Sequence, residues 1–233
     1  MKEAKVFDFD GTLTTCDTFL LFVKYACGFK RFLAGMLLYS PLLVLMKLKL
    51  YPNWKAKQRV FSHFFAGLSD CKFDALCRGF ADSNRQILRP KGISLVLQSL
   101  SAGEKVYIVS ASIDRWVRPF FDRLVSEGGL MDTISVIGTE IEVYNHVLTG
   151  RFSTKNCYGE EKVNRLSAVL KDRSSYHLTA YGDSNGDKEL LACPISSTRA
   201  PYLARMLMTD AVSPGRSCPV MRTNICSSFC CND

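Results

Sequence analysis

The stretch Val6–Thr12, with the sequence VFDFDGT, decides the fold of this chain. It follows a short apolar run, Ala4 to Phe9, in which Asp8 is the one acid. A central strand of a parallel sheet has no face in water, so its sequence is almost continuously apolar. Ligands of open α/β sheets bind just beyond the carboxyl ends of such strands. The stretch therefore predicts a buried strand of a parallel α/β sheet, followed by a ligand-binding loop.

Two carboxylates stand at this strand end, Asp8 and Asp10. Their spacing of two residues places both on one side of an extended chain. Unpaired buried charge is costly, so we expect a cation here, and Mg²⁺ is commonly held by one or two carboxylates plus a phosphate. Gly11 would let the backbone turn and approach a ligand closely. One carboxylate could attack an electrophile while the other moves protons, although the pair alone also fits a turn or an isolated metal ligand.

The charge of the chain is concentrated in one segment. Its 233 residues suffice for one domain with a sizeable core, or for a core plus a small insert. The net charge of +8 comes from residues 18–69, which contain no acid and eight bases. These bases are Lys24, Lys30, Arg31, Lys47, Lys49, Lys55, Lys57 and Arg59. They indicate an anionic partner, with a solvated basic surface as the alternative. Nucleic acid is not expected, because long aliphatic runs separate the bases.

Residues 16–86 predict an all-helical insert. Within it, Phe32–Met46 has no charged residue and is shorter than the roughly 20 residues that cross a bilayer. We expect either a packed helical hairpin bent at Ser40 and Pro41, or a re-entrant or interfacial segment anchored by its flanking bases. The other expected helices are Asp17–Ala26, Trp54–Leu68 and Phe73–Leu88, with His63 packed in the core.

The α/β pattern resumes after the insert, and polar residues again follow its strands. We expect strands at Lys105–Val109, Ser135–Ile137 and Leu178–Tyr181, helices at Gly92–Ser101, Ile113–Val125 and Glu160–Leu170, and a hairpin of Glu140–Val143 with Val147–Gly150. Ser110, Ala111 and Ser112 form either a phosphate cradle or an ordinary helix N-cap. Lys162 alone would equally fit a surface helix. The acidic turn GDSNGD after the last strand is not expected to bind calcium, because it lacks a terminal glutamate.

Four motifs in this order resemble the haloacid dehalogenase-like (HAD) phosphohydrolase superfamily: DFDGT, VSAS, the lysine of GEEKVNRL, and GDSNGD. The resemblance covers roughly residues 4–192 and is to the phosphoserine phosphatase-like branch. It implies an α/β core with a Rossmann-like parallel sheet, residues 1–15 and 87–192, and an all-helical cap, residues 16–86, inserted after the first strand. The stretch GTEIEVYNHVLTGRFSTKNCYGEEKV is similar to bacterial members that include phosphatidylglycerophosphatase-type enzymes.

The resemblance also implies roles for individual residues. Asp8 would be the nucleophile that takes the phosphoryl group, Asp10 the general acid and base, and Lys162 the cation that neutralises Asp8 and the phosphate. Mg²⁺ would be held by Asp8, Asp183 and the backbone carbonyl of Asp10. The other implied site residues are Gly11, Thr12, Ser110 and Ala111 for the phosphate, Asp17 and Arg59 for the leaving group, and Asn185 and Asp187 around the metal. The presence of Asp10 favours a phosphatase over a dehalogenase, because an alkoxide leaving group needs a proton and a halide does not.

These inferences predict a Mg²⁺-dependent phosphomonoester hydrolase. The basic, apolar cap favours a lipid or amphiphilic phosphate and peripheral membrane contact through the cap. The alternatives are a phosphatase of small soluble metabolites such as phosphoserine, and a catalytically impaired protein that binds membrane surfaces. We expect a cytoplasmic protein, free or peripheral to the inner face of the membrane, because no apolar leader precedes ten cysteines.

The last segment departs from the resemblance. Residues 193–233 are rich in serine, arginine, cysteine and proline and lack periodicity, where the family pattern expects another short strand. We expect a largely disordered tail that could weaken the fold and the activity. Zinc at Cys226, Cys230 and Cys231 is not expected, because no histidine follows them.

Overall fold

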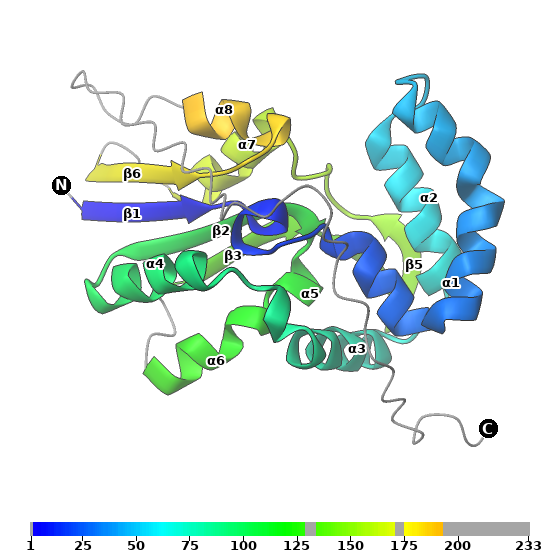
Figure 1. The fold of residues 1–233 in the computed structure, drawn as a ribbon, viewed down its shortest axis with the longest axis horizontal. Coiled ribbons are helices and arrows are strands. Elements are labelled where there is room, and N and C mark those ends of the chain that lie inside the picture. The colour runs from blue at the N-terminus through cyan, green and yellow to red at the C-terminus, as the bar shows by residue number, and fades with distance from the viewer. Residues whose placement is uncertain (1, 129–133, 171–174, 193–233) are drawn as a thin grey trace.

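The computed structural model describes residues 2–128, 134–170 and 175–192. Four parallel strands form the sheet in the order β3-β2-β1-β6 (Figure 1). They are β1 (Lys2–Phe7), β2 (Lys105–Ile113), β3 (Ile134–Thr139) and β6 (Tyr176–Tyr181). Phe7 is in register with Ile108 of β2 on one side and with Tyr181 of β6 on the other. The predicted fold, a parallel α/β sheet with helices inserted after the first strand, is confirmed.

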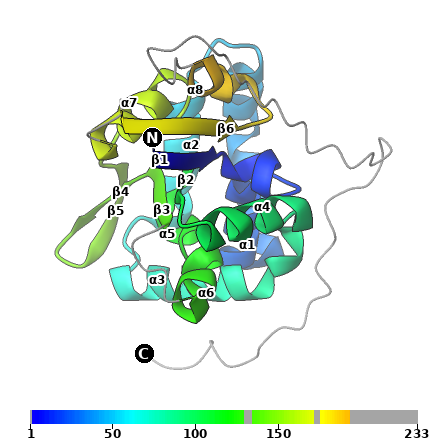
Figure 2. The same cartoon turned by 90° about the vertical axis from the view of Figure 1, so that its left-hand side faces the viewer.

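The sheet separates two apolar layers. In β2, Val106 and Ile108 face one layer, and Tyr107 and Val109 face the other. Helices α4 (Pro90–Ser101), α5 (Asp114–Val117) and α6 (Pro119–Gly128) cover the first face, and α7 (Glu160–Val169) and α8 (Lys188–Ala192) cover the second (Figure 2). Because both faces are covered, β1 is buried between its two neighbours, as its apolar sequence predicts.

The helix expected at Ile113–Val125 is interrupted. It divides into α5 and α6, and α6 begins at Pro119. Proline has no backbone N–H and suits the first position of a helix, where that donor would have no partner inside the helix. The residues before this break also differ from expectation, because β2 continues through Ser110 to Ile113.

The helical insertion between β1 and β2 consists of α1 (Thr18–Lys47), α2 (Asn53–Phe65), α3 (Asp70–Ser83) and the short η2 (Arg85–Ile87). The expected bend at Ser40 and Pro41 is wrong, since α1 continues through both residues and breaks instead at Gly28, where φ is 75°. Pro41 cannot donate to the carbonyl of Leu37, and the Ser40 hydroxyl donates to that carbonyl at 2.8 Å. The chain reverses at residues 48–52 and α2 runs back along α1.

Aromatic side chains join the helical insertion to the core. Phe22 of α1 stacks on Trp116 of α5 with ring centroids 4.6 Å apart, and it also contacts Phe65, Phe73 and Phe80. Aromatic pairs of this kind add stability beyond the area that they bury. His63 was expected in this core, but it is exposed and packs at the edge against Tyr39.

Two further contacts fix the insertion. The hairpin of β4 (Ile141–Tyr144) and β5 (Val147–Phe152) shares three backbone hydrogen bonds with the link between α2 and α3. They are Gly67 N to Leu148 O, Leu148 N to Leu68 O, and Asp70 N to His146 O, each 2.9 Å long. Arg115 of α5 pairs with Asp70 and Asp74 of α3. The predicted tail, residues 193–233, lies outside the described residues.

Candidate active site

The loop after β1 brings the candidate residues together at the carboxyl edge of the sheet. The amide of Asp8 donates to the Tyr181 carbonyl at 2.9 Å, which places Asp8 beside the turn that follows β6. Gly11 has φ of +83°, and a Cβ at this position would lie 2.5 Å from Asp183 Oδ2. The loop therefore requires glycine at position 11 both for its backbone conformation and for the approach of Asp183.

Lys162 of α7 lies between two buried carboxylates. Its Nζ donates to Asp8 Oδ1 at 2.5 Å and to Asp187 Oδ1 at 2.6 Å. All three side chains are at most 6% exposed. Burial alone would lower the pKa of Lys162, but the two carboxylates raise it above its usual value, so the lysine is charged. The predicted alternative for Lys162, a surface position on a helix, is not what the structure has.

The charged form of the Asp8 carboxyl is stabilised less than its contact with Lys162 suggests. Burial raises the pKa of its carboxyl to about 7; Lys162 opposes this effect, and the Asp187 and Asp10 charges add to it. One cation faces two carboxylates, so the group keeps an excess negative charge. A further cation at this place would relieve that excess.

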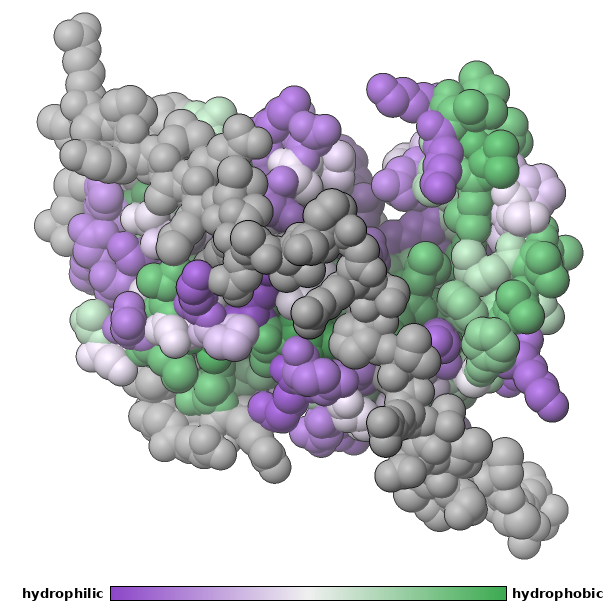
Figure 3. All heavy atoms as spheres, viewed as in Figure 1, coloured by the Kyte–Doolittle hydropathy of each residue, from purple (hydrophilic) through white to green (hydrophobic). Residues whose placement is uncertain are grey.

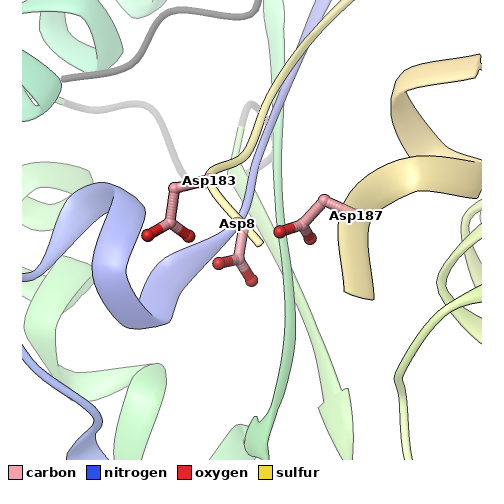
Figure 4. Close-up of side chains that lie close together, drawn as sticks. All are labelled: Asp8, Asp183 and Asp187. Atoms are coloured by element: carbon pink, nitrogen blue, oxygen red, sulfur yellow. The ribbon is translucent and has the colours of Figure 1, made fainter. Parts of the chain in front are cut away.

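Three carboxylates could hold that cation. Oxygens of Asp8, Asp183 and Asp187 lie within 4.8 Å of one another, with Asp8 between the other two (Figure 4). The Thr12 hydroxyl is 3.4 Å from Asp8 Oδ2 and 3.3 Å from Asp183 Oδ1, so these two oxygens face one space. Both oxygens of Asp187 are already used, by Lys162 and by Ser184. A set of hard oxygen ligands with excess negative charge fits Mg²⁺, with Asp8 and Asp183 as direct ligands and Asp187 in support.

Asp10 takes different partners from Asp8. Its Oδ1 accepts from the amide and hydroxyl of Thr18 at 2.8 and 2.6 Å, and its Oδ2 accepts from the Ser110 hydroxyl at 3.2 Å. Both aspartates lie beyond β1, which ends at Phe7, so the loop and not strand alternation sets their directions. Asp10 therefore lies between the core and the first turn of α1.

Ser110 and Ala111 line the same edge from β2. The buried Ser110 hydroxyl also accepts from the amide of Ser112 at 2.9 Å, and the residue before α5 is Ile113, which makes no side-chain cap. The N-cap alternative for this segment is therefore not observed. The Ala111 carbonyl accepts from the Thr139 hydroxyl at 2.9 Å.

Lys57 of α2, which was not among the predicted site residues, also reaches this edge. Its Nζ donates to the Ala111 carbonyl at 2.7 Å and lies 5.2 Å from the Phe19 ring centroid. Burial lowers the pKa of Lys57, and the charges of Asp10 and Asp17 oppose this effect. Asp17 caps α1 by accepting from the amide of Phe19 at 2.8 Å.

Arg59, which was predicted together with Asp17 to contact the leaving group, lies elsewhere. It is exposed, and its guanidinium is 5.5 Å from the Tyr51 ring centroid. Two residues along a helix are about 200° apart, so Lys57 and Arg59 point in opposite directions. Helical phase could have identified Lys57, because the buried Val60 and Phe61 follow it at three and four residues.

The remaining predicted residues lie around the metal-binding group. Thr12 is buried between Asp8 and Asp183, whereas Asn185 is exposed and begins η4 (Asn185–Asp187). A residue that the sequence argument missed, Arg89, holds the loop from outside. Its Nε donates to the carbonyls of Gly11 and Thr14 at 3.2 and 3.1 Å.

Comparisons with known proteins agree with this geometry. A family model described as haloacid dehalogenase-like hydrolase matches residues 6–192. Protein CicA of Caulobacter vibrioides is 33% identical over 189 residues, which are 80% of each chain. A Bordetella pertussis protein of unknown function has a similar structure, with a TM-score of 0.67, 20% identity, and coverage of 82% of this chain and 86% of that one. A phosphoserine phosphohydrolase-like protein from Francisella tularensis has a TM-score of 0.53 and 16% identity, with 82% of each chain covered. At these identities the two structures show a shared fold.

Proposed function

Because the chain belongs to the haloacid dehalogenase-like hydrolase family, we propose that it hydrolyses phosphomonoesters with Mg²⁺ through a phosphoryl group on Asp8. The observation that supports this most is the buried contact of Lys162 with Asp8 and Asp187 beside Asp183. This contact holds the Asp8 carboxylate in one orientation at the edge of the sheet, next to oxygen ligands for a cation. Positioning and charge stabilisation account for most catalysis of phosphoryl transfer.

In the first step, an oxygen of Asp8 forms a bond to phosphorus while the bond to the ester oxygen breaks. Lys162 holds Asp8 and offsets its negative charge. Asp10, held by Thr18 and Ser110, gives a proton to the departing alkoxide. Mg²⁺ held by Asp8, Asp183 and the Asp10 carbonyl would offset charge on the phosphate oxygens.

In the second step, Asp10 takes a proton from water, and the water oxygen forms a bond to phosphorus. The bond between phosphorus and Asp8 breaks, so that inorganic phosphate leaves and both aspartates return to their starting state. The Ser110 hydroxyl, which donates to Asp10 in the structure, would donate to a phosphate oxygen when substrate is present. Thr12 and the amide of Ala111 would complete the contacts to the phosphate. The amide of Gly11, which was predicted to contact it, donates instead to the Thr14 hydroxyl at 3.2 Å.

The helical insertion would act as the cap that selects the leaving group. We propose a lipid or amphiphilic phosphate as substrate, because residues 18–69 are basic and apolar and contain no acid. The likeness of residues 138–163 to phosphatidylglycerophosphatase-type enzymes supports a glycerolipid phosphate within that class. Asp17 and Lys57 favour a second candidate, phosphoserine, since an acid and a base together can bind an amino acid.

The test is hydrolysis by the purified chain with and without Mg²⁺. The substrates are p-nitrophenyl phosphate, a lipid phosphomonoester in detergent micelles, and phosphoserine. We expect Asp8→Asn to lower the rate by about 10⁴-fold or more, as when an enzyme loses its nucleophile, without loss of the folded state. The matched control is Asp82→Asn, an exposed aspartate of α3 that pairs only with the nearby Arg85 among the described residues. Equal rates for the parent and Asp8→Asn would reject the proposal, and a higher rate on phosphoserine than on the lipid would favour the second candidate.

A further inference from the structure

The outer side of α1 beyond Gly28 has an unusual surface. Nine of the sixteen large apolar side chains that are exposed in the described chain lie between Phe29 and Trp54. Six of them are here called the apolar face: Phe29, Leu33, Leu37, Leu38, Leu48 and Leu50. Leu37, Leu38 and Leu50 are 66%, 65% and 72% exposed. Figure 3 shows apolar side chains gathered over α1, on the side of the molecule away from the sheet.

The opposite side of α1 already has a partner. Gly35 packs so closely on Phe64 of α2 that a Cβ there would lie 2.2 Å from its ring, and Tyr39 contacts His63. By length and composition, α1 could cross a membrane. Only 6% of its most apolar 18-residue segment is buried inside the structure. A helix that is apolar on all sides normally lies in a protein core or in a membrane. The apolar face thus lacks a partner among the residues that the structure describes.

The contacts at the two ends of this hairpin argue against a single crossing of a bilayer. At the start of α1, the Thr18 amide donates to Asp10. On the returning helix α2, Lys57 donates to the Ala111 carbonyl. Both ends therefore meet the same edge of the sheet, whereas one crossing would put them on opposite sides of the membrane. Residues 29–47 span about 28 Å at about 1.5 Å per residue and would lie in the plane of the surface.

The charges around the apolar face identify its partner. Lys30 and Arg31 lie at one end and Lys47 and Lys49 at the other, and all four are exposed. They form no ion pair with a residue that the structure describes, and residues 18–69 contain no acid. Trp54, 45% exposed, lies beside them with Lys55 over its ring. Apolar side chains, a tryptophan and flanking bases together match the boundary between the headgroups and acyl chains of an anionic membrane.

We propose that the apolar face docks in the plane of an anionic lipid bilayer, with the flanking lysines and arginine against the headgroups. The helix α2 then lies between the bilayer and the candidate active site. This proposal rests on the surface alone and does not depend on the reaction. It is therefore tested with Asp8→Asn as well as with the parent chain, so that a loss of hydrolysis cannot be mistaken for a loss of docking.

The experiment is sedimentation of the full chain with vesicles of phosphatidylcholine alone, or with phosphatidylglycerol in equal parts. We expect binding to the anionic vesicles, weakened by salt because exposed charges are screened. Each base near the headgroups adds about a fivefold factor, so Lys47→Glu with Lys49→Glu should lower binding by at least about 25-fold. The matched control is Lys2→Glu with Lys72→Glu, two exposed lysines outside the apolar face.

The apolar contribution is tested by Leu37→Ser with Leu38→Ser. Both side chains are exposed, so the variant should fold like the parent and lose most binding at either salt concentration. Its control is Leu97→Ser with Val169→Ser, which are 41% and 51% exposed on α4 and α7. Equal sedimentation of the parent and the Leu37/Leu38 variant would overturn the proposal. The proposal would also be overturned if neither protein bound vesicles, the parent were a dimer and this variant were a monomer. The apolar face would then be an interface between copies of the chain.

Discussion

Replacing Gly11 with alanine should separate the placement of Asp183 from the general strain of the loop. Alanine at φ +83° costs about 1–2 kcal/mol, because its Cβ crowds the carbonyl oxygen in left-handed backbone. Its Cβ would also lie 2.5 Å from Asp183 Oδ2, a contact too short to persist, so the carboxylate must move. The substitution thus has a conformational effect on stability and a separate effect on the metal-binding group.

Gly67 supplies the matched control. Its φ is +84°, nearly that of Gly11, and a Cβ there would meet no described atom within 4 Å. Both alanine variants should therefore lose about 1–2 kcal/mol of unfolding free energy in urea without Mg²⁺. Only Gly11→Ala should weaken Mg²⁺ binding, by about 10–100-fold, which is the usual effect of disturbing the orientation of metal ligands.

The assay is the Mg²⁺ concentration that gives half-maximal hydrolysis of p-nitrophenyl phosphate, with half-maximal thermal stabilisation as a second measure. Thermal stabilisation does not require turnover, so it remains measurable if the variant is inactive. If Gly11→Ala and Gly67→Ala respond to Mg²⁺ equally, Asp183 does not hold the metal at the place inferred from the structure.

Three further predictions concern Asp10, Asp8 and Lys57. Asp10→Asn should slow hydrolysis of an alkyl phosphate by about 10²–10⁴-fold. The leaving group of p-nitrophenyl phosphate needs no proton, so this ester should still give a stoichiometric burst of nitrophenolate. Absence of that burst would contradict the acid role of Asp10. Burial raises the pKa of Asp8 from 3.8 to about 7 in the folded state, so the metal-free protein should lose stability as pH rises from about 4 to about 7 and then level off. Thermal stabilisation by Mg²⁺ should grow over the same range as protons cease to compete, and a pH-independent Mg²⁺ effect would exclude Asp8 as a ligand. Lys57→Met should raise KM by about 10–100-fold for a substrate with a second anionic group, whereas Arg59→Met should change KM less than about twofold. A larger effect of Arg59→Met than of Lys57→Met would show that Arg59 contacts that group.

The sheet and the candidate site were predictable to different extents. Parallel strands end at one edge, so polar residues after three apolar runs predict that Asp8, Ser110 and Asp183 lie along it. That Asp8 and Asp183 share one metal was implied by the family resemblance. The pairing of Lys162 with both Asp8 and Asp187 follows from the family resemblance and not from local sequence. A helix lysine has the same local sequence whether it is buried or in water.

The errors have local causes. Proline at position 41 predicts a bend, but the Ser40 hydroxyl satisfies the carbonyl that proline leaves free, and the helix continues. The short helix expected at Asp17–Ala26 is only the first part of α1, which breaks at Gly28 and then continues to Lys47. Lys57 and Arg59 have similar chemistry, and only the phase of α2 against its buried side separates them.

The contact between the β4–β5 hairpin and the helical insertion helps to limit how often the insertion can part from the core. Three backbone hydrogen bonds join Gly67, Leu68 and Asp70 to the hairpin, and each is worth about 1 kcal/mol net. Parting them alone would cost about 3 kcal/mol, and the Phe61–Phe152 ring contact and the pairs of Arg115 with Asp70 and Asp74 would have to part as well. Fewer than about one molecule in 150 would therefore be open at any moment. A substrate that approaches from the hairpin side would then almost always meet the closed arrangement. Hydrogen exchange at the amide of Leu148, which donates to Leu68, would count those openings directly.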